Sequence, residues 1–306
     1  MFPFADTCWF LSGPTAGGKT AVGIELARRI DAEIVSLDSM AVYRGMDIGT
    51  AKPTAAERAA VPHHLLDLVE THEEYSVARY LADAEQAAQA IHARNKKVLF
   101  VGGTPLYLKA LLRGIFEGPA ADWDFRHDLQ RLAREEGLEA LHRRLAAVDP
   151  AAANKLHVQD ERRLIRALEV FEKTGKPISK WQAQFDQGRT AEVCRVFVLD
   201  WPREELYERI NRRVDAMFAA GLVEEVQSLL AIGKPFSRTA SQAVGYREVL
   251  EHLSGARDLA ATIDLVKMRT RQFAKRQLTW FRSLSECRFV PVCEPLETHS
   301  VAAQIM

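Results

Sequence analysis

Apolar residues in the first third of the chain fall in short runs, and each run is followed by a longer segment with helical periodicity. The runs at 8–12, 33–37 and 97–101 predict buried strands. The segments 18–30 and 76–93 predict amphipathic helices. Strands and helices that alternate in this way indicate an α/β fold, with a parallel sheet flanked by helices.

The pattern changes between 118 and 190, where charged amphipathic helices dominate and no strand is convincing. These helices are expected at 125–136, 138–147 and 159–174. A strand pattern returns at 193–199. The segment 118–190 is therefore predicted to be a helical insertion in one α/β core made of 1–117 and 191–306. The last third is predicted to be helical, at 203–231, 239–253 and 256–285.

The first predicted strand leads directly into a phosphate-binding pattern. Residues 13–20 read Gly-Pro-Thr-Ala-Gly-Gly-Lys-Thr and match G-x-x-x-x-G-K-[ST]. Glycine at positions 13 and 18 allows the loop amides to turn inward around anionic oxygens. The predicted diphosphate-binding residues are Gly13, Pro14, Thr15, Ala16, Gly17, Gly18, Lys19 and Thr20. Lys19 adds positive charge, and the Thr20 hydroxyl suits a Mg²⁺ ion held by the same phosphates. The pattern does not decide which diphosphate is bound.

Two further strand ends carry residues that suit chemistry beside a bound diphosphate. Ligands of parallel sheets collect at the carboxyl ends of the strands, where this chain has Asp38-Ser39 and Gly-Gly-Thr104. Asp38 suits a general base that takes a proton from an incoming nucleophile; a second magnesium ligand or a helix cap is the alternative. Thr104 suits a hydrogen bond to that nucleophile or to the leaving oxygen, or a simple helix cap.

Basic residues gather locally although the formal net charge is zero. The run 267–282 carries six basic residues and no acidic one, interleaved with Met and aromatic residues. A stretch of one sign suits contact with phosphates, and a basic face packed on acidic neighbours is the alternative. Two smaller clusters are formed by Arg162, Arg163 and Arg166, and by Arg209, Arg212 and Arg213.

Composition narrows the classes of protein. The chain has 306 residues, of which 47% are hydrophobic and 27% charged, as in ordinary globular proteins. No stretch approaches the ~20 apolar residues that span a membrane, and the N-terminus lacks a signal-peptide pattern. Four cysteines without metal or disulfide spacing indicate reduced thiols in a cytoplasmic protein.

The residues alone leave two classes of function open. One is a small-molecule P-loop kinase in which Asp38 orients an alcohol. The other is a transferase that holds a diphosphate leaving group and modifies a nucleic-acid base. A P-loop motor or switch protein is less favoured, because strand 97–101 ends in Gly-Gly-Thr where an acidic residue is expected.

Seven blocks of sequence make the chain resemble the bacterial tRNA dimethylallyltransferases, also called tRNA isopentenyltransferases, over essentially its whole length. Besides the phosphate loop, the matching blocks lie at 38–53, 62–67, 101–107, 163–170, 244–247 and 274–282. The most specific are Asp-Ser-Met-Ala-Val-Tyr-Arg-Gly-Met-Asp-Ile-Gly-Thr-Ala-Lys-Pro and Ala-Lys-Arg-Gln-Leu-Thr-Trp-Phe-Arg. Gly17 and Met40-Ala41 differ from the usual family residues without removing a necessary chemical group.

The resemblance implies transfer of a dimethylallyl group from its diphosphate to N6 of adenine-37, next to the anticodon, in tRNAs that read codons beginning with U. Asp38 would be the base and Thr104 would place the amine. Lys19, Arg213, and Thr20 with Mg²⁺ would stabilise the departing diphosphate. The implied partners are dimethylallyl diphosphate and the tRNA anticodon stem-loop, without a membrane or an obligate protein partner. An adenylate isopentenyltransferase, which needs no helices to grip an anticodon, remains an alternative.

The same resemblance implies which residues touch tRNA, and they come from six parts of the chain. They are Asp38, Ser39, Met40, Ala41, Thr104, Arg126, Arg162, Arg163, Leu164, Ile165, Arg166, Gln242, Ala243, Val244, Gly245, Tyr246, Arg247, Lys275, Arg276, Gln277, Trp280 and Arg282. The insertion and the basic clusters are thus expected to grip the anticodon stem and loop.

Overall fold

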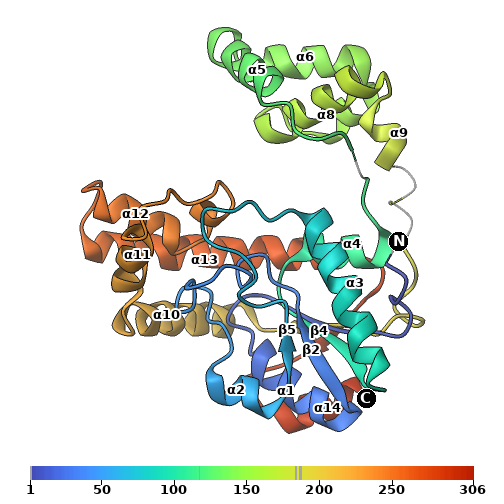
Figure 1. Ribbon diagram of the computed structural model, residues 1–306, viewed down its shortest axis with the longest axis vertical. Helices are drawn as coiled ribbons and strands as arrows, with labels where there is room; N and C mark the ends of the chain where they lie inside the picture. Colours follow the sequence, from blue (N-terminus) through green and yellow to red (C-terminus); the bar gives the residue numbers. More distant parts are fainter. Residues whose placement is uncertain (1, 117, 183–184, 186–187) are drawn as a thin grey trace. The chain divides into compact units, whose positions relative to one another are not determined.

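The computed structural model describes residues 2–116, 118–182, 185 and 188–306 and divides into two compact units (Figure 1). The larger α/β unit comprises residues 1–112 and 188–306, and the smaller helical unit comprises 113–187. The sequence predicts 118–190 for the helical segment. In the described part of the chain, no helix combines the length and the apolar character needed to cross a membrane.

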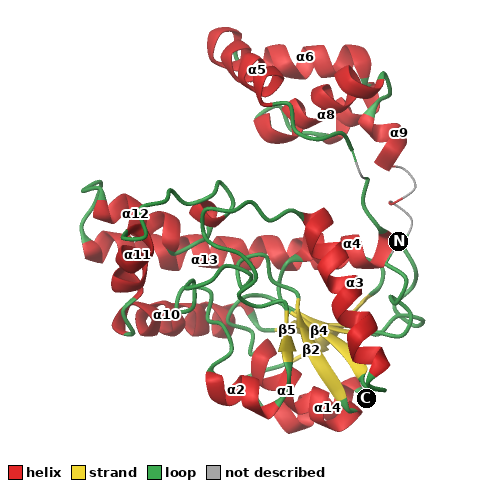
Figure 2. Ribbon diagram, viewed as in Figure 1, coloured by secondary structure: helices red, strands yellow, loops and turns green. Residues whose placement is uncertain are grey.

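A parallel sheet of six strands, in the order β3-β2-β4-β1-β5-β6, forms the centre of the α/β unit (Figure 2). The strands are β1 (Trp9–Ser12), β2 (Ala32–Ser36), β3 (His63–His64), β4 (Lys97–Val101), β5 (Val196–Asp200) and β6 (Cys287–Pro291). The predicted strands at 8–12, 33–37, 97–101 and 193–199 are confirmed as β1, β2, β4 and β5. The α/β class with a parallel sheet is confirmed as well.

Different helices bury the two faces of this sheet. Successive side chains of a strand point to opposite faces, so Phe10 and Leu11 of β1 lie in separate apolar clusters. Phe10 shares its cluster with α3 (Val77–Ala93), and Leu11 packs with α1 (Lys19–Ile30) and α14 (Thr298–Ile305). Figure 2 shows α3 on one side of the strands and α1 with α14 on the other. Burial on both faces explains why the strands read as nearly continuous apolar runs.

Shorter helices and the helices of the last third complete this unit. They are α2 (Ala55–Ala60), α4 (Pro105–Arg113), α10 (Arg203–Ala219), α11 (Leu222–Leu230), α12 (Tyr246–Leu253) and α13 (Leu259–Arg282), with a 3₁₀ turn η2 (Ala240–Gln242) before α12. The predicted helix 203–231 is wrong as a single element, because the chain breaks between α10 and α11 at Gly221. Its φ of 96° lies outside the helical region and favours glycine.

The all-helical prediction for the last third is also wrong at its end. After α13 the chain returns to the sheet as β6, which pairs in parallel with β5. A five-residue edge strand that ends in Pro291 carries little of the alternating pattern by which strands are recognised.

The helical unit has an apolar core of its own. Its helices are α5 (Trp123–Glu136), α6 (Leu138–Val148), α7 (Pro150–Lys155), α8 (Glu161–Thr174) and α9 (Ile178–Gln182). Leu129, Leu141 and Leu164, from three different helices, are fully or almost fully buried together. The predicted helices at 125–136, 138–147 and 159–174 are confirmed as α5, α6 and α8.

Candidate active site

The phosphate loop joins β1 to α1 and leaves the start of that helix open. Gly13 and Gly18 have φ values of +147° and +79°, which side chains rarely permit. Gly18 is the N-cap of α1, and no side chain caps the first helical amides. A Cβ atom at Gly18 would lie 2.2 Å from Leu296 Cδ2. The loop therefore offers an anion the uncapped first amides of α1 and the positive end of the helix dipole.

Lys19 lies across this loop. Its Nζ donates hydrogen bonds to the carbonyl oxygens of Gly13 (3.1 Å) and Pro14 (2.7 Å). Burial, together with the positive charge of Arg213, lowers the pKa of Lys19 to about 7, against the opposing effect of Asp38. An anionic ligand would favour the charged ammonium and raise this pKa again.

We expect Lys19→Met to stabilise the ligand-free protein at neutral and lower pH. The pKa of Lys19 falls from 10.5 to about 7 on folding, so the unfolded chain holds the proton more strongly. The resulting penalty is complete below pH ~7 and fades as the pH rises toward ~10.5. In calorimetry the Tm of the variant should exceed that of the wild type by roughly 2–6 °C at about pH 6. The two should converge in alkali; a gap independent of pH would contradict this assignment.

Asp38 follows β2 and has one carboxylate oxygen fixed by the backbone. Its Oδ1 accepts hydrogen bonds from the amides of Met40 (2.8 Å) and Ala41 (3.2 Å). These contacts form a tight turn that sets the direction of the side chain. The negative charge of Asp38 also acts on the pKa values of Lys19 and Arg213, so the three groups share one electrostatic environment.

Thr104 lies beside this turn. Its Oγ1 accepts a hydrogen bond from the amide of Ser39 (3.1 Å). The end of β4 approaches the end of β2 so closely that a Cβ atom at Gly102 would lie 2.2 Å from the carbonyl oxygen of Leu37. The glycines before Thr104 thus allow the two strand ends to meet, and the structure brings the predicted Asp38 and Thr104 together.

Arg213 approaches from α10. Its Nη2 lies 3.5 Å from the carbonyl oxygen of Thr50, and its buried Nε has no acceptor among the described residues. Burial lowers the pKa of Arg213, while Asp38 opposes the shift. A buried guanidinium nitrogen without a partner is costly, and an anionic ligand would supply the missing acceptor.

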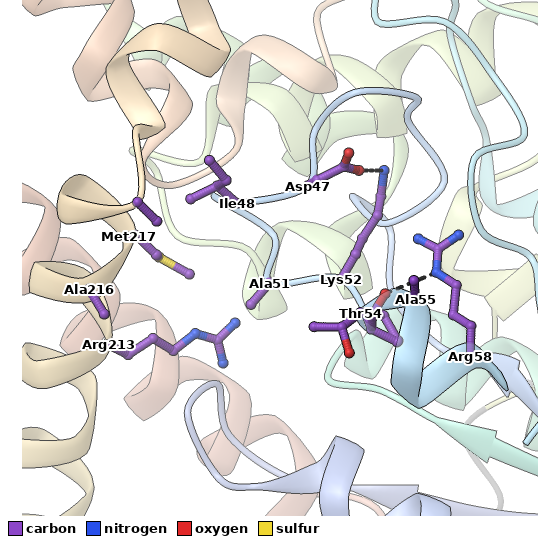
Figure 3. A pocket seen from close by; sticks show the side chains of 12 residues that line it. Asp47, Ile48, Ala51, Lys52, Thr54, Ala55, Arg58, Arg213, Ala216 and Met217 are labelled. Carbon is purple, nitrogen blue, oxygen red and sulfur yellow. Dashed lines mark hydrogen bonds and ion pairs between the residues drawn. The ribbon is translucent and has the colours of Figure 1, made fainter. Parts of the chain in front are cut away.

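Arg213 also lines a cavity of about 650 Å³ (Figure 3). The walls come from residues 47–58 and from one face of α10, and they combine apolar side chains such as Ile48 and Met217 with basic ones. The side chain of Lys52 is 2% exposed, and its Nζ pairs with Asp47 (2.7 Å) and Asp67 (2.6 Å). These ion pairs fix the segment that faces Arg213.

Two side chains that the sequence did not assign to the diphosphate site brace the loop. Trp201 Nε1 donates to the carbonyl oxygen of Gly17 (3.1 Å), and Arg209 Nε donates to that of Ala16 (2.9 Å). The guanidinium carbon of Arg209 lies 4.3 Å from the centre of the Trp201 ring. Arg209 appeared in the sequence only as part of a basic cluster, and Trp201 only as a residue after a predicted strand.

Several residues expected to touch tRNA have side chains that are buried in this structure. These are Ala41, Leu164, Ile165, Ala243, Tyr246 and Gln277. Tyr246 has no exposed surface, and its hydroxyl donates to Glu225, whose carboxylate also accepts the amides of Asp47 and Ile48. Their side chains pack inside the protein, so their part in tRNA binding stays a prediction.

Other residues expected at the tRNA are exposed. These are Arg162, Arg163, Gln242, Arg247, Lys275, Arg276, Trp280 and Arg282. Within the helical unit, Arg126 and Arg166 are half-buried, and both pair with the fully buried carboxylate of Glu169. Glu169 therefore fixes the position of two of the predicted arginines.

The basic run of α13 serves two purposes along its length. Lys267 pairs with Asp215 (2.6 Å), Arg269 pairs with Glu248, and Arg271 donates to Asn211 (2.6 Å). The alternative of a basic face packed on its neighbours is therefore correct for this half. Lys275 and Arg276, further along the helix, are exposed.

The parallel sheet and the phosphate loop define an α/β protein of the P-loop class, and Lys19, Arg213 and Asp38 form its candidate anion site. The chain belongs to the family described as IPP transferase, whose family model matches residues 41–284.

Relatives in other organisms cover almost the whole chain. The tRNA dimethylallyltransferase of Rhodopirellula baltica is 48% identical, over 94% of this chain and 88% of that protein. The tRNA dimethylallyltransferase of Geobacter metallireducens is 49% identical, over 92% of this chain and 91% of that protein. The resemblance drawn from the sequence motifs is thus confirmed, and with it the prenyltransferase class of enzyme.

Solved structures agree with this assignment. The tRNA isopentenylpyrophosphate transferase of Bacillus halodurans is 38% identical with a TM-score of 0.71, covering 98% of this chain and 94% of its own. A eukaryotic dimethylallyltransferase, whose structure is described as acting on tRNA, is 28% identical with a TM-score of 0.78, covering 97% and 76% respectively.

Proposed function

We propose that this chain transfers the dimethylallyl group of dimethylallyl diphosphate to N6 of adenine-37 in tRNAs that read codons beginning with U, and releases diphosphate. The observation that carries the proposal is the convergence of Lys19, Arg213 and Asp38 at an uncapped phosphate loop. The relatives of this chain that are named tRNA dimethylallyltransferases support tRNA and a dimethylallyl donor as the substrates.

The phosphate loop stabilises the leaving group in this proposal. Cleavage of the allylic C–O bond releases a multiply charged anion, and fixed donors act where that charge develops. A well-placed donor of this kind contributes about 3–4 kcal/mol. The loop amides, Lys19 and Arg213 are such donors. The cavity beside Arg213, with apolar and basic walls, suits a donor that joins a short hydrocarbon to an anion.

Thr20 is the residue that would hold Mg²⁺. Its half-buried hydroxyl lies in the first turn of α1, and no cluster of three acidic, His or Cys ligands occurs within the described ranges. The ion usually takes few protein ligands and completes its shell with phosphate oxygens and water, so a single hydroxyl fits. Bound there, it would supply further charge stabilisation to the diphosphate.

Asp38 and Thr104 act on the nucleophile. The exocyclic amine of adenine is conjugated with the ring and therefore a poor nucleophile, so removal of its proton favours attack. The turn holds Asp38 through Oδ1, which leaves Oδ2 to accept the proton. The Thr104 hydroxyl would align the amine with the allylic carbon, and exclusion of water would protect the donor from hydrolysis.

The exposed basic side chains of α13 and of the helical unit would hold the RNA. A base in an anticodon loop leaves its stack at a cost of only a few kcal/mol. Lys275 and Arg276, together with Arg162 and Arg163, offer the charge for backbone contacts. Because tRNA is the acceptor, we expect the enzyme to act in the cytoplasm.

Removal of these charges should change the salt dependence of tRNA binding. The double substitution of Lys275 and Arg276 by Ala should reduce the slope of log Kobs against log[salt] by up to about 1.4–1.8, since each lost phosphate contact contributes ~0.7–0.9. Lys267→Ala is the matched control, because Lys267 lies on the same helix but pairs with Asp215. Equal slopes for wild type and double variant would make the exposed end of α13 structural.

One set of incubations tests the proposed function. Labelled dimethylallyl diphosphate and Mg²⁺ are supplied with unmodified tRNA, with AMP or with ATP, and the products are digested to nucleosides. Label should enter only the tRNA, at N6 of adenine-37. Label in AMP or ATP would favour an adenylate isopentenyltransferase, and consumption of ATP without any isoprenoid would favour a kinase.

A further inference from the structure

Gln277 of α13 contacts the phosphate loop and is shielded from solvent. The residue is only 3% exposed. Its Oε1 accepts a hydrogen bond from the amide of Thr15 (2.9 Å), and its Nε2 donates to the carbonyl oxygen of Gly103 (2.6 Å). Both ends of the carboxamide are thus used, and they tie the loop to the turn that follows β4.

These contacts lie at the end of the loop that Lys19 reaches. Lys19 Nζ donates to the carbonyl oxygens of Gly13 and Pro14. A Cβ atom on Gly103 would lie 2.6 Å from Gln277 Nε2 and 3.4 Å from Lys19 Nζ, so the carboxamide and the ammonium flank the same glycine. In nucleotide-binding loops of this pattern, the amides cradle the first two phosphates and the lysine reaches the second and third. Gln277 therefore stands where a third phosphate would extend.

The carboxamide changes what this end of the loop can bind. The N–H of Thr15 already donates a hydrogen bond to Oε1 of Gln277. This oxygen carries partial negative charge and would repel a phosphate oxygen. The donor Nε2 cannot turn to replace it without losing its bond to Gly103. At the other end of the loop, the first amides of α1 have no side-chain cap. Backbone N–H donors are thus available to an anion at the start of α1, whereas the N–H of Thr15 is already bonded to Gln277.

We propose that Gln277 limits the phosphate loop to ligands with two phosphates and so sets the specificity of the site for a diphosphate over a nucleoside triphosphate. The inference rests on the proposed function, in which the loop holds a diphosphate. In this proposal Gln277 acts on the diphosphate-binding loop, whereas the family resemblance implies that it contacts tRNA.

The test compares two anions that carry no organic group. The purified full-length protein is titrated by calorimetry with inorganic pyrophosphate and with inorganic tripolyphosphate, both with Mg²⁺. The wild type should bind pyrophosphate at least about 10-fold more tightly. Gln277→Ala should bring the two affinities to within about 3-fold, chiefly by tightening the binding of tripolyphosphate. Gln277→Asn, which is too short to reach both partners, should shift the ratio in the same direction and serves if the alanine variant does not fold.

The control is Gln272→Ala, because Gln272 is exposed on the same helix; its ratio should equal that of the wild type. A folded Gln277 variant that keeps the wild-type ratio, or binds both anions more weakly by the same factor, would overturn the inference and leave a structural role. So would a wild type that binds tripolyphosphate as tightly as pyrophosphate. A wild type that binds neither anion would instead contradict the diphosphate site, and with it the proposed function.

Discussion

Asp38→Asn should lower the single-turnover rate of prenyl transfer by roughly 10²–10⁴-fold, the range that a general base supplies, and leave tRNA affinity within about 2-fold. In the wild type, the amides of Met40 and Ala41 donate hydrogen bonds to Asp38 Oδ1. Asparagine keeps this Oδ1 acceptor, but it cannot take the proton from N6. The turn should therefore persist while the chemistry is lost. Rates are measured by rapid quench with saturating tRNA, and affinity by filter binding.

Asp38→Ala provides the comparison, because it removes both the base and the turn contacts. Its rate should fall at least as far as that of the asparagine variant. Comparable losses of rate and of tRNA affinity in Asp38→Asn would argue against the base role and assign the carboxylate to RNA binding or to the turn.

Arg213→Met should lower kcat/KM for the isoprenoid donor by roughly 10²–10³-fold, as expected when a donor to a developing anion is removed. The buried Nε of Arg213 has no acceptor among the described residues, so we expect the ligand to supply its partner. The ligand-free variant should be as stable as the wild type or more so, because an unsatisfied buried group is removed. Steady-state kinetics and thermal unfolding measure the two effects.

Arg212→Met is the matched control for this substitution. Arg212 is the preceding residue, but its side chain is 66% exposed and pairs with Glu294, so donor kinetics should change little. Retention of tRNA on a filter should be nearly intact for both variants. If Arg213→Met abolished that retention, Arg213 would be reassigned to the RNA.

The sequence was sufficient to predict those parts of the site that are local in the chain. The phosphate loop, Asp38 and Thr104 each follow an apolar run, and the carboxyl ends of parallel strands meet at one edge of a sheet. The parallel arrangement puts these ends at one edge of the sheet, and the order β2-β4-β1 makes them neighbours there.

Contacts between distant residues could not be predicted in the same way. The bond from Thr15 to Gln277 joins positions 262 residues apart, and the pairing of Arg269 with Glu248 depends on how α12 packs against α13. The charges in the sequence therefore predicted one continuous basic surface over 267–282, although several of these side chains pair with neighbouring helices. Periodicity did carry a further clue: Gln277 lies three residues after Ala274 and four before Phe281, both fully buried, and so shares their face of the helix.

The central claim is that the loop receives diphosphate as it separates from carbon, and the position of one oxygen atom tests this most directly. Dimethylallyl diphosphate labelled with ¹⁸O in the bridging C–O–P position is incubated with the enzyme, Mg²⁺ and unmodified tRNA, without any nucleotide. We expect cleavage of the C–O bond, with all the label in the released diphosphate and one prenylated adenine formed for each diphosphate. Label recovered in dimethylallyl alcohol, or a requirement for ATP, would contradict the account.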